Sequence, residues 1–428
     1  MLNFAEQTGS GAVMIVWSFL RHALLFLLII SSLSTKIVYI RSRKNRESEK
    51  THSMYCTTNT IMTLFNLSSF LILGMVFSKA SAFATPKRFV ITGASGYLGR
   101  EIVNSILENE QTDDESEILC LVRESRVEDE KKYWNSESSV SVRKYDMLDG
   151  GKTIEDVLSS IYSGDSKNDN ECCIYHVASI FTPTEDHKQM ALDNVKGAED
   201  LMNAVAKFPN EKTRVILTSS MAGVRGGGQT PKNGKWYTEE DWNTQAELGA
   251  SWGASYQWSK AESERRAWDI SKDLGVKFTS LNPSFIFGPP SNPETSQSFS
   301  ISTVSKWVSG EGAVQSRLCV DVRDVAKAHV IAGINDKTIG ERIIISTEAR
   351  IPSETMAEEL KRMAIEMGIG EPDKIYPDTN FDGGAIKIGE QEVSCADRME
   401  SLLDGFKVRD VEATMRDMAK VLLEMEKR

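Results

Sequence analysis

A tyrosine and a lysine four positions apart, Tyr256 and Lys260, are the residues of this chain best suited to proton transfer. Residues at this spacing share one face of a helix, so their side chains can interact. A free tyrosine has a pKa of about 10, which is too high for a ready acid at neutral pH. A nearby ammonium group favours the phenolate and is expected to lower that pKa, which suits the pair to proton exchange with a carbonyl or hydroxyl group.

Two serines end a predicted strand upstream of this pair. Residues 214–218 form a β-rich run that continues into Ser219 and Ser220. A hydroxyl at this position can donate a hydrogen bond to the same substrate oxygen as the tyrosine. The spacing of Tyr and Lys is by itself a weak signal, because most chance occurrences lie on surface helices, so its meaning depends on the segments that precede it.

Residues 88–103 predict a strand, a glycine turn and a helix. A β-branched run leads into three glycines and then into apolar residues at helical spacing. Glycine permits a tight turn and close approach of a pyrophosphate, and a helix N-terminus offers free N–H groups and the positive end of the helix dipole. The segment therefore predicts a dinucleotide site, formed by Gly93, Ser95, Gly96, Tyr97, Leu98 and Gly99.

The second predicted strand, residues 118–122, ends at Arg123. In such a βαβ unit an acidic residue at this position binds the ribose hydroxyl of NAD, whereas a basic residue accommodates the 2′-phosphate of NADP. Arg123 therefore favours NADPH over NAD, with Arg126 as a second cation. The alternative is an arginine that is simply solvated at the end of a strand.

The next two predicted strands carry further cofactor candidates at their carboxyl ends. Residues 140–145 are followed by Asp146, which is expected to hydrogen-bond the adenine, and by Met147, which is expected beside the ring. A turn-forming carboxylate is the alternative interpretation of Asp146. Residues 172–177 lead into Ala178, which we also place at the cofactor.

The alternation of strands with helical stretches predicts an α/β fold, a Rossmann-type doubly wound parallel sheet whose ligands lie at the carboxyl ends of its strands. After residue 290 this alternation is lost and helices dominate, which predicts a smaller, mostly helical C-terminal substrate lobe. We therefore divide the chain into a leader (1–86), a dinucleotide-binding domain (87–290) and the lobe (291–428), with 319–347 returning to the Rossmann core.

Composition excludes several other classes of protein. The chain has 428 residues and a formal net charge of −11, so a nucleic-acid partner, which requires a basic face, is not expected. Its six cysteines form no C-x-x-C pair. We therefore predict neither a metal site nor a disulfide framework, and the expected partner is a small molecule.

The first 86 residues contain apolar stretches but no pattern of a folded domain. Residues 13–20 and 23–30 are interrupted by charge, whereas residues 61–78 are uncharged and are followed by the small residues Ala80 and Ala82. Three interpretations stay open: a cleaved secretory signal, an uncleaved membrane anchor, and delivery to the plastid of an alga with complex plastids. The expected location is the secretory pathway or endoplasmic reticulum, with membrane association through these segments.

The order of glycine turn, strand-end serines and Tyr–Lys pair resembles the extended short-chain dehydrogenase/reductase family, also called the NAD-dependent epimerase/dehydratase superfamily. The resemblance extends from about residue 87 to the C-terminus and includes the motifs at 282–289, 320–326 and 340–346. Within the family, the chain looks most like the branch of dihydroflavonol reductases, cinnamoyl-CoA reductases and methylglyoxal reductases.

This resemblance implies an NADPH-dependent oxidoreductase that reduces a ketone or aldehyde to an alcohol. It implies that Ser220 donates to the substrate oxygen, with Ser219 in this role if the register slips by one. Tyr256 would be the acid/base, Lys260 its electrostatic partner and ribose anchor, and the segment that begins at Pro283 would orient the nicotinamide. Sugar-nucleotide epimerases or dehydratases, 3β-hydroxysteroid-type dehydrogenases and a non-enzymatic dinucleotide-binding protein are the alternatives.

Two departures from this branch leave the substrate open. Cinnamoyl-CoA reductases carry an Asn-Trp-Tyr-Cys string around the tyrosine, which is absent here. Arg225 stands where dihydroflavonol reductases have a substrate-binding asparagine, and it begins an insertion, 225–248, that belongs to this chain. Further upstream, Asn194 is expected to open a helix and is either a buried structural amide or a group that holds water near the chemistry.

Overall fold

The computed structural model describes residues 88–109, 116–163, 171–292, 298–368, 371–380 and 388–426. The predicted leader lies outside these residues. Within the described ranges, no helix combines the length and the apolar character needed to cross a membrane.

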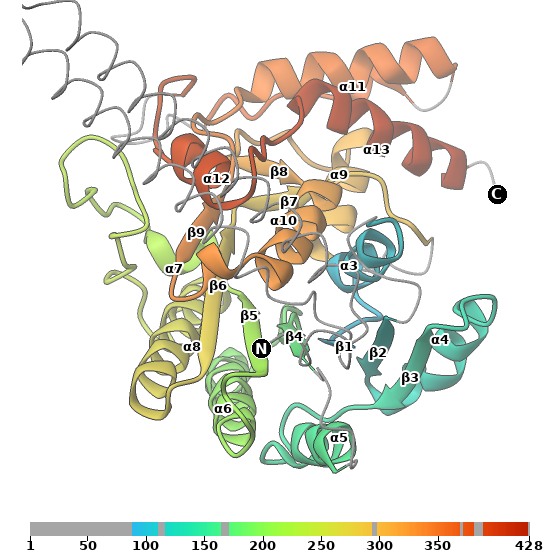
Figure 1. Ribbon diagram of the computed structural model, residues 1–428. Coiled ribbons are helices and arrows are strands. Elements are labelled where there is room, and N and C mark those ends of the chain that lie inside the picture. The colour runs from blue at the N-terminus through green and yellow to red at the C-terminus, as the bar shows by residue number, and fades with distance from the viewer. Residues whose placement is uncertain are drawn as a thin grey trace, which may run out of the picture. The chain divides into compact units, whose positions relative to one another are not determined.

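A seven-stranded sheet forms the centre of the fold, with the strand order β3-β2-β1-β4-β5-β6-β9 (Figure 1). Every neighbouring pair of strands is parallel. The order reverses between β1 and β4, which creates the crevice at the carboxyl ends where this type of sheet binds its ligands. The predicted doubly wound sheet is confirmed, with strands β1 Arg88–Thr92, β2 Glu117–Val122, β3 Val140–Lys144, β4 Cys172–His176, β5 Thr213–Thr218, β6 Lys277–Pro283 and β9 Arg342–Ile345.

Both faces of the sheet are covered by helices, as Figure 1 shows. Alternate residues of β1 point to opposite faces, so that Phe89 and Ile91 join one buried cluster and Val90 joins the other. Burial on both sides explains why the central strands are continuous apolar runs. Helices α3 and α10 supply side chains to the first cluster and α5, α6 and α8 to the second, with bounds α3 Tyr97–Leu107, α5 Lys152–Tyr162, α6 His187–Val205, α8 Trp252–Leu274 and α10 Val322–Ile334.

Two helices differ from the sequence-based expectation. Helix α6 begins at His187, before the expected start at Asn194, because Asp186 caps it by accepting a hydrogen bond from the Gln189 N–H at 3.4 Å. Helix α4, Val127–Tyr133, lies in a charged segment that predicts no helix. It is held by a buried ion pair between Glu130 and Arg100 of α3, a tertiary contact that local periodicity does not reveal.

The C-terminal part adds a small sheet and several helices. Strands β7, Phe285–Phe287, and β8, Cys319–Asp321, pair in parallel outside the main sheet. Segment 319–347 also supplies α10 and β9 to the central layers. Helix α13, Val411–Glu426, buries the side chains of Met415 and Met418. The remaining helices of this region are α9 Phe299–Val308, α11 Ser353–Met367, α12 Ala396–Leu402 and α13 Val411–Glu426.

Candidate active site

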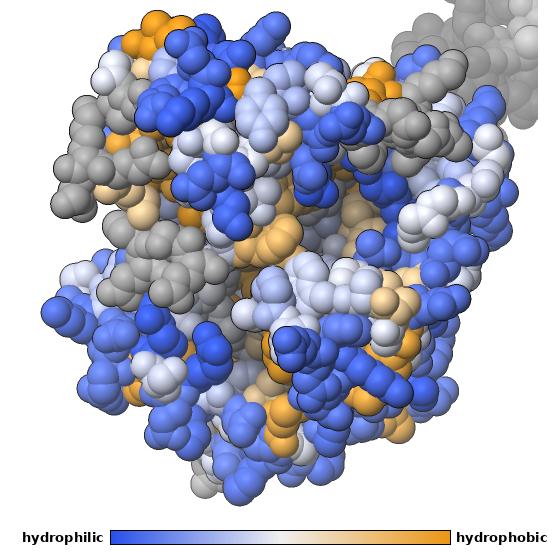
Figure 2. Space-filling view, turned by 180° about the vertical axis from the view of Figure 1, so that it is seen from behind, coloured by the Kyte–Doolittle hydropathy of each residue, from blue (hydrophilic) through white to orange (hydrophobic). Residues whose placement is uncertain are grey.

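A cavity of about 1110 Å³ opens at the carboxyl ends of the strands. It joins the glycine turn, the ends of β2, β4, β5 and β6, and the start of α8. Seen from behind, the molecule is hollowed on one face, with hydrophobic residues inside the hollow and hydrophilic residues around it (Figure 2). All but one of the predicted site residues line the cavity: Gly93, Ser95, Gly96, Tyr97, Leu98, Gly99, Arg123, Met147, Ala178, Ser220, Tyr256, Lys260 and Pro283.

The glycine turn leaves no room for side chains. A Cβ at Gly99 would lie 2.2 Å from the Gly93 carbonyl oxygen, and one at Gly93 would lie 2.9 Å from the Ala178 amide nitrogen. Gly93 also has a φ of +73°, which side chains other than hydrogen rarely permit. Gly96 is the N-cap of α3 and adds no side-chain cap, so the first N–H groups of that helix stay available to an anion. This geometry fits the pyrophosphate of a dinucleotide.

Three cofactor candidates lie at the ends of β2 and β3, and they differ in whether they line the cavity. Arg123 is exposed and lines the cavity, and within the described part of the chain its guanidinium makes no ion pair. Met147 also lines the cavity, whereas Asp146 does not. The Asp146 carboxylate accepts a hydrogen bond from the Leu148 N–H at 3.0 Å, so its contact is that of a turn-forming residue. The expected contact of Asp146 with the adenine stays a prediction.

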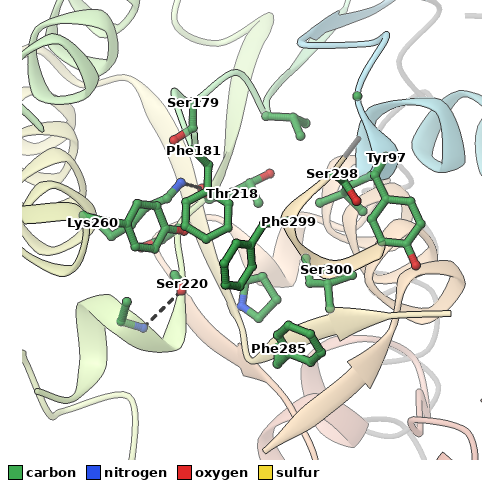
Figure 3. Close-up of a pocket in the computed structure, with 18 of the residues that line it drawn as sticks. Tyr97, Ser179, Phe181, Thr218, Ser220, Lys260, Phe285, Ser298, Phe299 and Ser300 are labelled. Atoms are coloured by element: carbon green, nitrogen blue, oxygen red, sulfur yellow. Dashed lines mark hydrogen bonds between the residues drawn. The ribbon is translucent and has the colours of Figure 1, made fainter. Parts of the chain in front are cut away.

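Tyr256 and Lys260 both line the cavity, and Figure 3 shows the Lys260 side chain directed toward Thr218. Lys260 Nζ donates a hydrogen bond to the Thr218 carbonyl at 3.1 Å and lies 5.9 Å from the centre of the Tyr256 ring. Burial lowers the pKa of Lys260 to about 8, against the opposing effect of the Glu264 carboxylate.

Burial raises the pKa of Tyr256, and the neighbouring Ser220 hydroxyl opposes this to a smaller extent. The expected net lowering of this pKa is wrong here, because burial beside the Phe181 ring outweighs the opposing effects and Lys260 directs its hydrogen bond to a backbone carbonyl. Tyr256 therefore keeps its proton at neutral pH, and it is equipped to act as an acid.

The two strand-end serines have different surroundings. Ser219 is buried and donates to Glu264 Oε2 at 2.7 Å. Ser220 caps the short helix α7, Met221–Val224, by accepting from the Ala222 N–H at 3.1 Å (Figure 3). Its hydroxyl also lies close enough to the Tyr256 phenol to oppose the rise in that pKa. The serine beside the phenol is therefore Ser220 rather than Ser219, a choice that the sequence left open.

Glu264 is a buried charge at the site that sequence reasoning missed. It lies one turn beyond Lys260 on α8 and accepts from Ser219, from Ser280 of β6 at 2.7 Å and from Arg342 Nε of β9 at 2.6 Å. Although burial raises its pKa, the Arg342 guanidinium and these hydrogen bonds hold the pKa of Glu264 below its ordinary value. The continued spacing of four residues after Tyr256 and Lys260 is the signal that could have revealed it.

The sequence allows two roles for Asn194, a buried structural amide or a group that holds water. The structure shows the contacts of a structural amide. Its Oδ1 accepts from the Ile180 N–H at 2.7 Å, and its Nδ2 donates to the Ile180 carbonyl at 3.0 Å. Both hydrogen-bonding groups of the amide are therefore committed to the loop that follows β4.

Aromatic side chains form a wall around Tyr256 that sequence reasoning also missed. The Phe181 ring lies 4.2 Å from the Tyr256 ring and 5.0 Å from that of Phe299, measured between centroids. Trp252 lies 6.2 Å from Tyr256. Figure 3 shows the rings of Phe181 and Phe299 next to each other in the pocket, with the Phe285 ring below Phe299. These rings come from separate segments, so no local pattern predicts their meeting.

Known proteins resemble the chain at the level of sequence and of fold. The family model described as male sterility protein, an NAD-binding family, matches residues 91–327, more than half of the chain. Tetraketide alpha-pyrone reductase 2 of Arabidopsis thaliana is 27% identical over 267 residues, which cover 60% of this chain and 77% of that protein. The NADPH-dependent methylglyoxal reductase of Saccharomyces cerevisiae is 26% identical over 280 residues, with coverage of 60% and 77%.

Among solved structures, yeast methylglyoxal/isovaleraldehyde reductase complexed with NADPH matches with a TM-score of 0.64 at 23% sequence identity. The match covers 80% of this chain and 99% of the yeast chain. This similarity establishes a shared fold.

Proposed function

Because the chain belongs to the NAD-binding family described as male sterility protein, we propose that it is an NADPH-dependent oxidoreductase that reduces a ketone or aldehyde to an alcohol. One observation carries the proposal: a single cavity joins the glycine turn to the Ser220–Tyr256 pair. Relatives named as a tetraketide alpha-pyrone reductase, an NADPH-dependent methylglyoxal reductase and a cinnamoyl-CoA reductase support it.

The cofactor end of the cavity fits NADPH. Gly93, Gly96 and Gly99 leave space for the pyrophosphate, and the first N–H groups of α3 are available to it. Arg123 supplies a cation for a 2′-phosphate. When bound, NADPH supplies the hydride that reduces the carbonyl carbon. Ala178, Met147 and Pro283 line the same part of the protein and would border the cofactor, and Lys260 would contact its ribose.

Proton transfer is the task of the chain's own residues. Ser220 would hold the carbonyl oxygen through its hydroxyl, and Tyr256 would donate its phenolic proton to the same oxygen as negative charge develops there. With a pKa of about 8, Lys260 is mostly charged at neutral pH and would stabilise the phenolate that remains. The aromatic wall of Phe181, Trp252 and Phe299 would exclude water from this step.

The arrangement favours reduction over sugar-nucleotide epimerisation. Epimerases and dehydratases of this fold usually hold NAD permanently and carry an acidic residue after the second strand. Here that position is Arg123, which opposes an acidic contact with the ribose of NAD. The secretory or plastid location of the chain stays a prediction from its leader, and N-terminal sequencing of the mature protein tests whether that leader is removed.

Oxidation of NADPH and of NADH, measured with a panel of aldehydes, ketones, flavonoids and sterol ketones, tests the proposal. We expect carbonyl-dependent oxidation of NADPH and at least tenfold lower kcat/KM with NADH, since about 1.4 kcal/mol from one phosphate contact gives this factor. Absence of carbonyl-dependent oxidation across the panel, with a nucleotide sugar converted instead, would reject the reductase assignment.

A further inference from the structure

Three arginines line the cavity in addition to the residues of the proposed reaction: Arg225, Arg317 and Arg350. They come from distant segments of the chain. Arg225 follows α7, which begins directly after Ser220, whereas Arg317 precedes β8 and Arg350 follows β9. Their meeting at one cavity is a product of the tertiary fold, and none of them is needed to bind a dinucleotide or to move a proton.

One carboxylate, that of Glu392, is shared by two of these arginines. Arg225 Nη1 lies 2.9 Å from Glu392 Oε1, and Arg350 Nε donates to Glu392 Oε2 at 3.0 Å. Arg350 Nη1 also donates to the Ser316 carbonyl at 2.8 Å. These contacts tie the loop after β9 to the segment around Glu392, so structure alone explains Arg225 and Arg350.

Arg317 is not explained in this way. Within the described ranges its guanidinium has no carboxylate partner; Nη2 donates to the Gln315 side chain, and Nε is buried without a hydrogen-bond acceptor. Burial lowers the pKa of Arg317, and the charges of Arg350 and Arg225 lower it further. Among the described residues, Arg317 thus adds a cation without a carboxylate partner beside two other arginines, and its charge is held where solvent screens it poorly.

Phe285 links Arg317 to the substrate end of the cavity. The Arg317 guanidinium lies 5.3 Å from the centre of the Phe285 ring. Figure 3 shows this ring in the pocket, below Phe299 and Ser300. Phe285 follows Pro283 by two residues, so the arginine borders the segment that we expect at the nicotinamide.

We propose that the group of Arg225, Arg317 and Arg350 binds an anionic group of the substrate, so that the compound reduced carries a carboxylate or phosphate in addition to its carbonyl. A guanidinium presents paired N–H donors that match the oxygens of either anion. An anion here would offset the mutual repulsion of the three cations. This inference rests on the proposed reductase activity and specifies its substrate class.

Matched substrates with and without the anion test the inference. The kcat/KM with NADPH is measured for 3-formylbenzoate and 4-formylbenzoate, each against its methyl ester, and for 4-formylphenyl phosphate against 4-methoxybenzaldehyde. We expect at least one acid or phosphate to exceed its neutral partner by about tenfold or more, as for other charge-assisted hydrogen bonds. The carboxylate and phosphate arms show which anion the site prefers.

Arg317→Gln should remove most of that preference, and Arg317→Lys should retain part of it because the charge remains without the paired donors. Arg266→Gln is the matched control, since Arg266 lies on the exposed surface of α8 and pairs with Glu262 at 2.9 Å. The control should keep the full preference. Circular dichroism and thermal melting establish that each variant is folded.

The outcomes separate this inference from the proposed function. Equal reduction of anionic and neutral partners by the wild type and by Arg317→Gln would overturn the anion site while leaving the reductase intact. If no carbonyl compound is reduced, the reductase assignment fails. Calorimetric binding of 4-(hydroxymethyl)benzoate then still decides on the anion site: about tenfold weaker binding by Arg317→Gln supports it, and equal affinity overturns it.

Discussion

The two ends of the cavity are built in different ways. The cofactor end consists largely of backbone from one short stretch, Gly93 to Gly99, where the closeness of main-chain atoms excludes side chains. The substrate end consists of side chains such as Phe181, Phe299 and Arg317, which reach it from distant parts of the chain. An end made of local backbone can change little without loss of function, whereas an end made of separate side chains can change one residue at a time.

The largest effect is expected at the point where the two ends meet. Tyr256→Phe removes the phenolic proton but keeps the ring against Phe181, so we expect carbonyl reduction to fall by about 10²–10⁴-fold, the usual contribution of a positioned acid. NADPH binding, measured by fluorescence titration, should change little. If NADPH binding and turnover fell together, Tyr256 would serve the cofactor end as well as the substrate end, which would contradict this comparison.

Gly99→Ala tests the cofactor end by itself. The new Cβ would meet the Gly93 carbonyl oxygen and the Ala94 Cα, both backbone atoms that cannot move aside easily. We expect a loss of about 1–3 kcal/mol in the free energy of unfolding, as for other overpacked sites, and NADPH binding weaker by about tenfold or more. Gly253→Ala on α8 is the matched control, because no atom lies within 4 Å of its added Cβ. Normal affinity in Gly99→Ala would contradict the steric account of the turn.

Arg123→Ala should change the KM for NADPH and the KM for NADH by different amounts. Loss of a charge-assisted contact with the 2′-phosphate should raise the KM for NADPH by about tenfold and leave that for NADH nearly unchanged. Steady-state kinetics with both cofactors measure this, with Arg266→Gln as a control for the removal of an exposed positive charge. Equal changes in both KM values would show that Arg123 does not read the phosphate.

The smallest effect is expected from pH. Burial lowers the pKa of Lys260 to about 8, so its ammonium group loses its proton as the pH rises through that value. Since the charged lysine is the form that stabilises the Tyr256 phenolate, kcat/KM for carbonyl reduction should be halved near pH 8 and fall further above it. A profile that stays flat up to pH 10 would show that the charge of Lys260 does not assist the proton transfer.

Sequence patterns predicted the local parts of this molecule well. The parallel sheet and the membership of the family are confirmed, because strand composition, glycine spacing and motif order are all written along the chain. The pair of Tyr256 and Lys260 was also visible, since the spacing of four residues has a fixed meaning on a helix.

Contacts between distant segments account for what the sequence could not supply. The raised pKa of Tyr256 follows from rings contributed by other elements, and the ion pair of Glu264 with Arg342 joins α8 to β9. The hydrogen bond of the Asp146 carboxylate with the Leu148 N–H is visible only in the folded turn. The sequence also does not reveal the pairing of Arg225 and Arg350 with Glu392, because these residues are far apart in the chain.

Transfer of deuterium from labelled NADPH tests the central claim most directly. Each of the two NADPH forms deuterated at one face of nicotinamide C4 is incubated with the wild-type protein and a carbonyl compound that it reduces, and the alcohol is examined by mass spectrometry. We predict that one of the two forms places its deuterium on the former carbonyl carbon, and that Tyr256→Phe yields almost no labelled alcohol. An alcohol without label from either form would contradict hydride transfer from the cofactor, and labelled alcohol at an undiminished rate in Tyr256→Phe would contradict the role of the tyrosine.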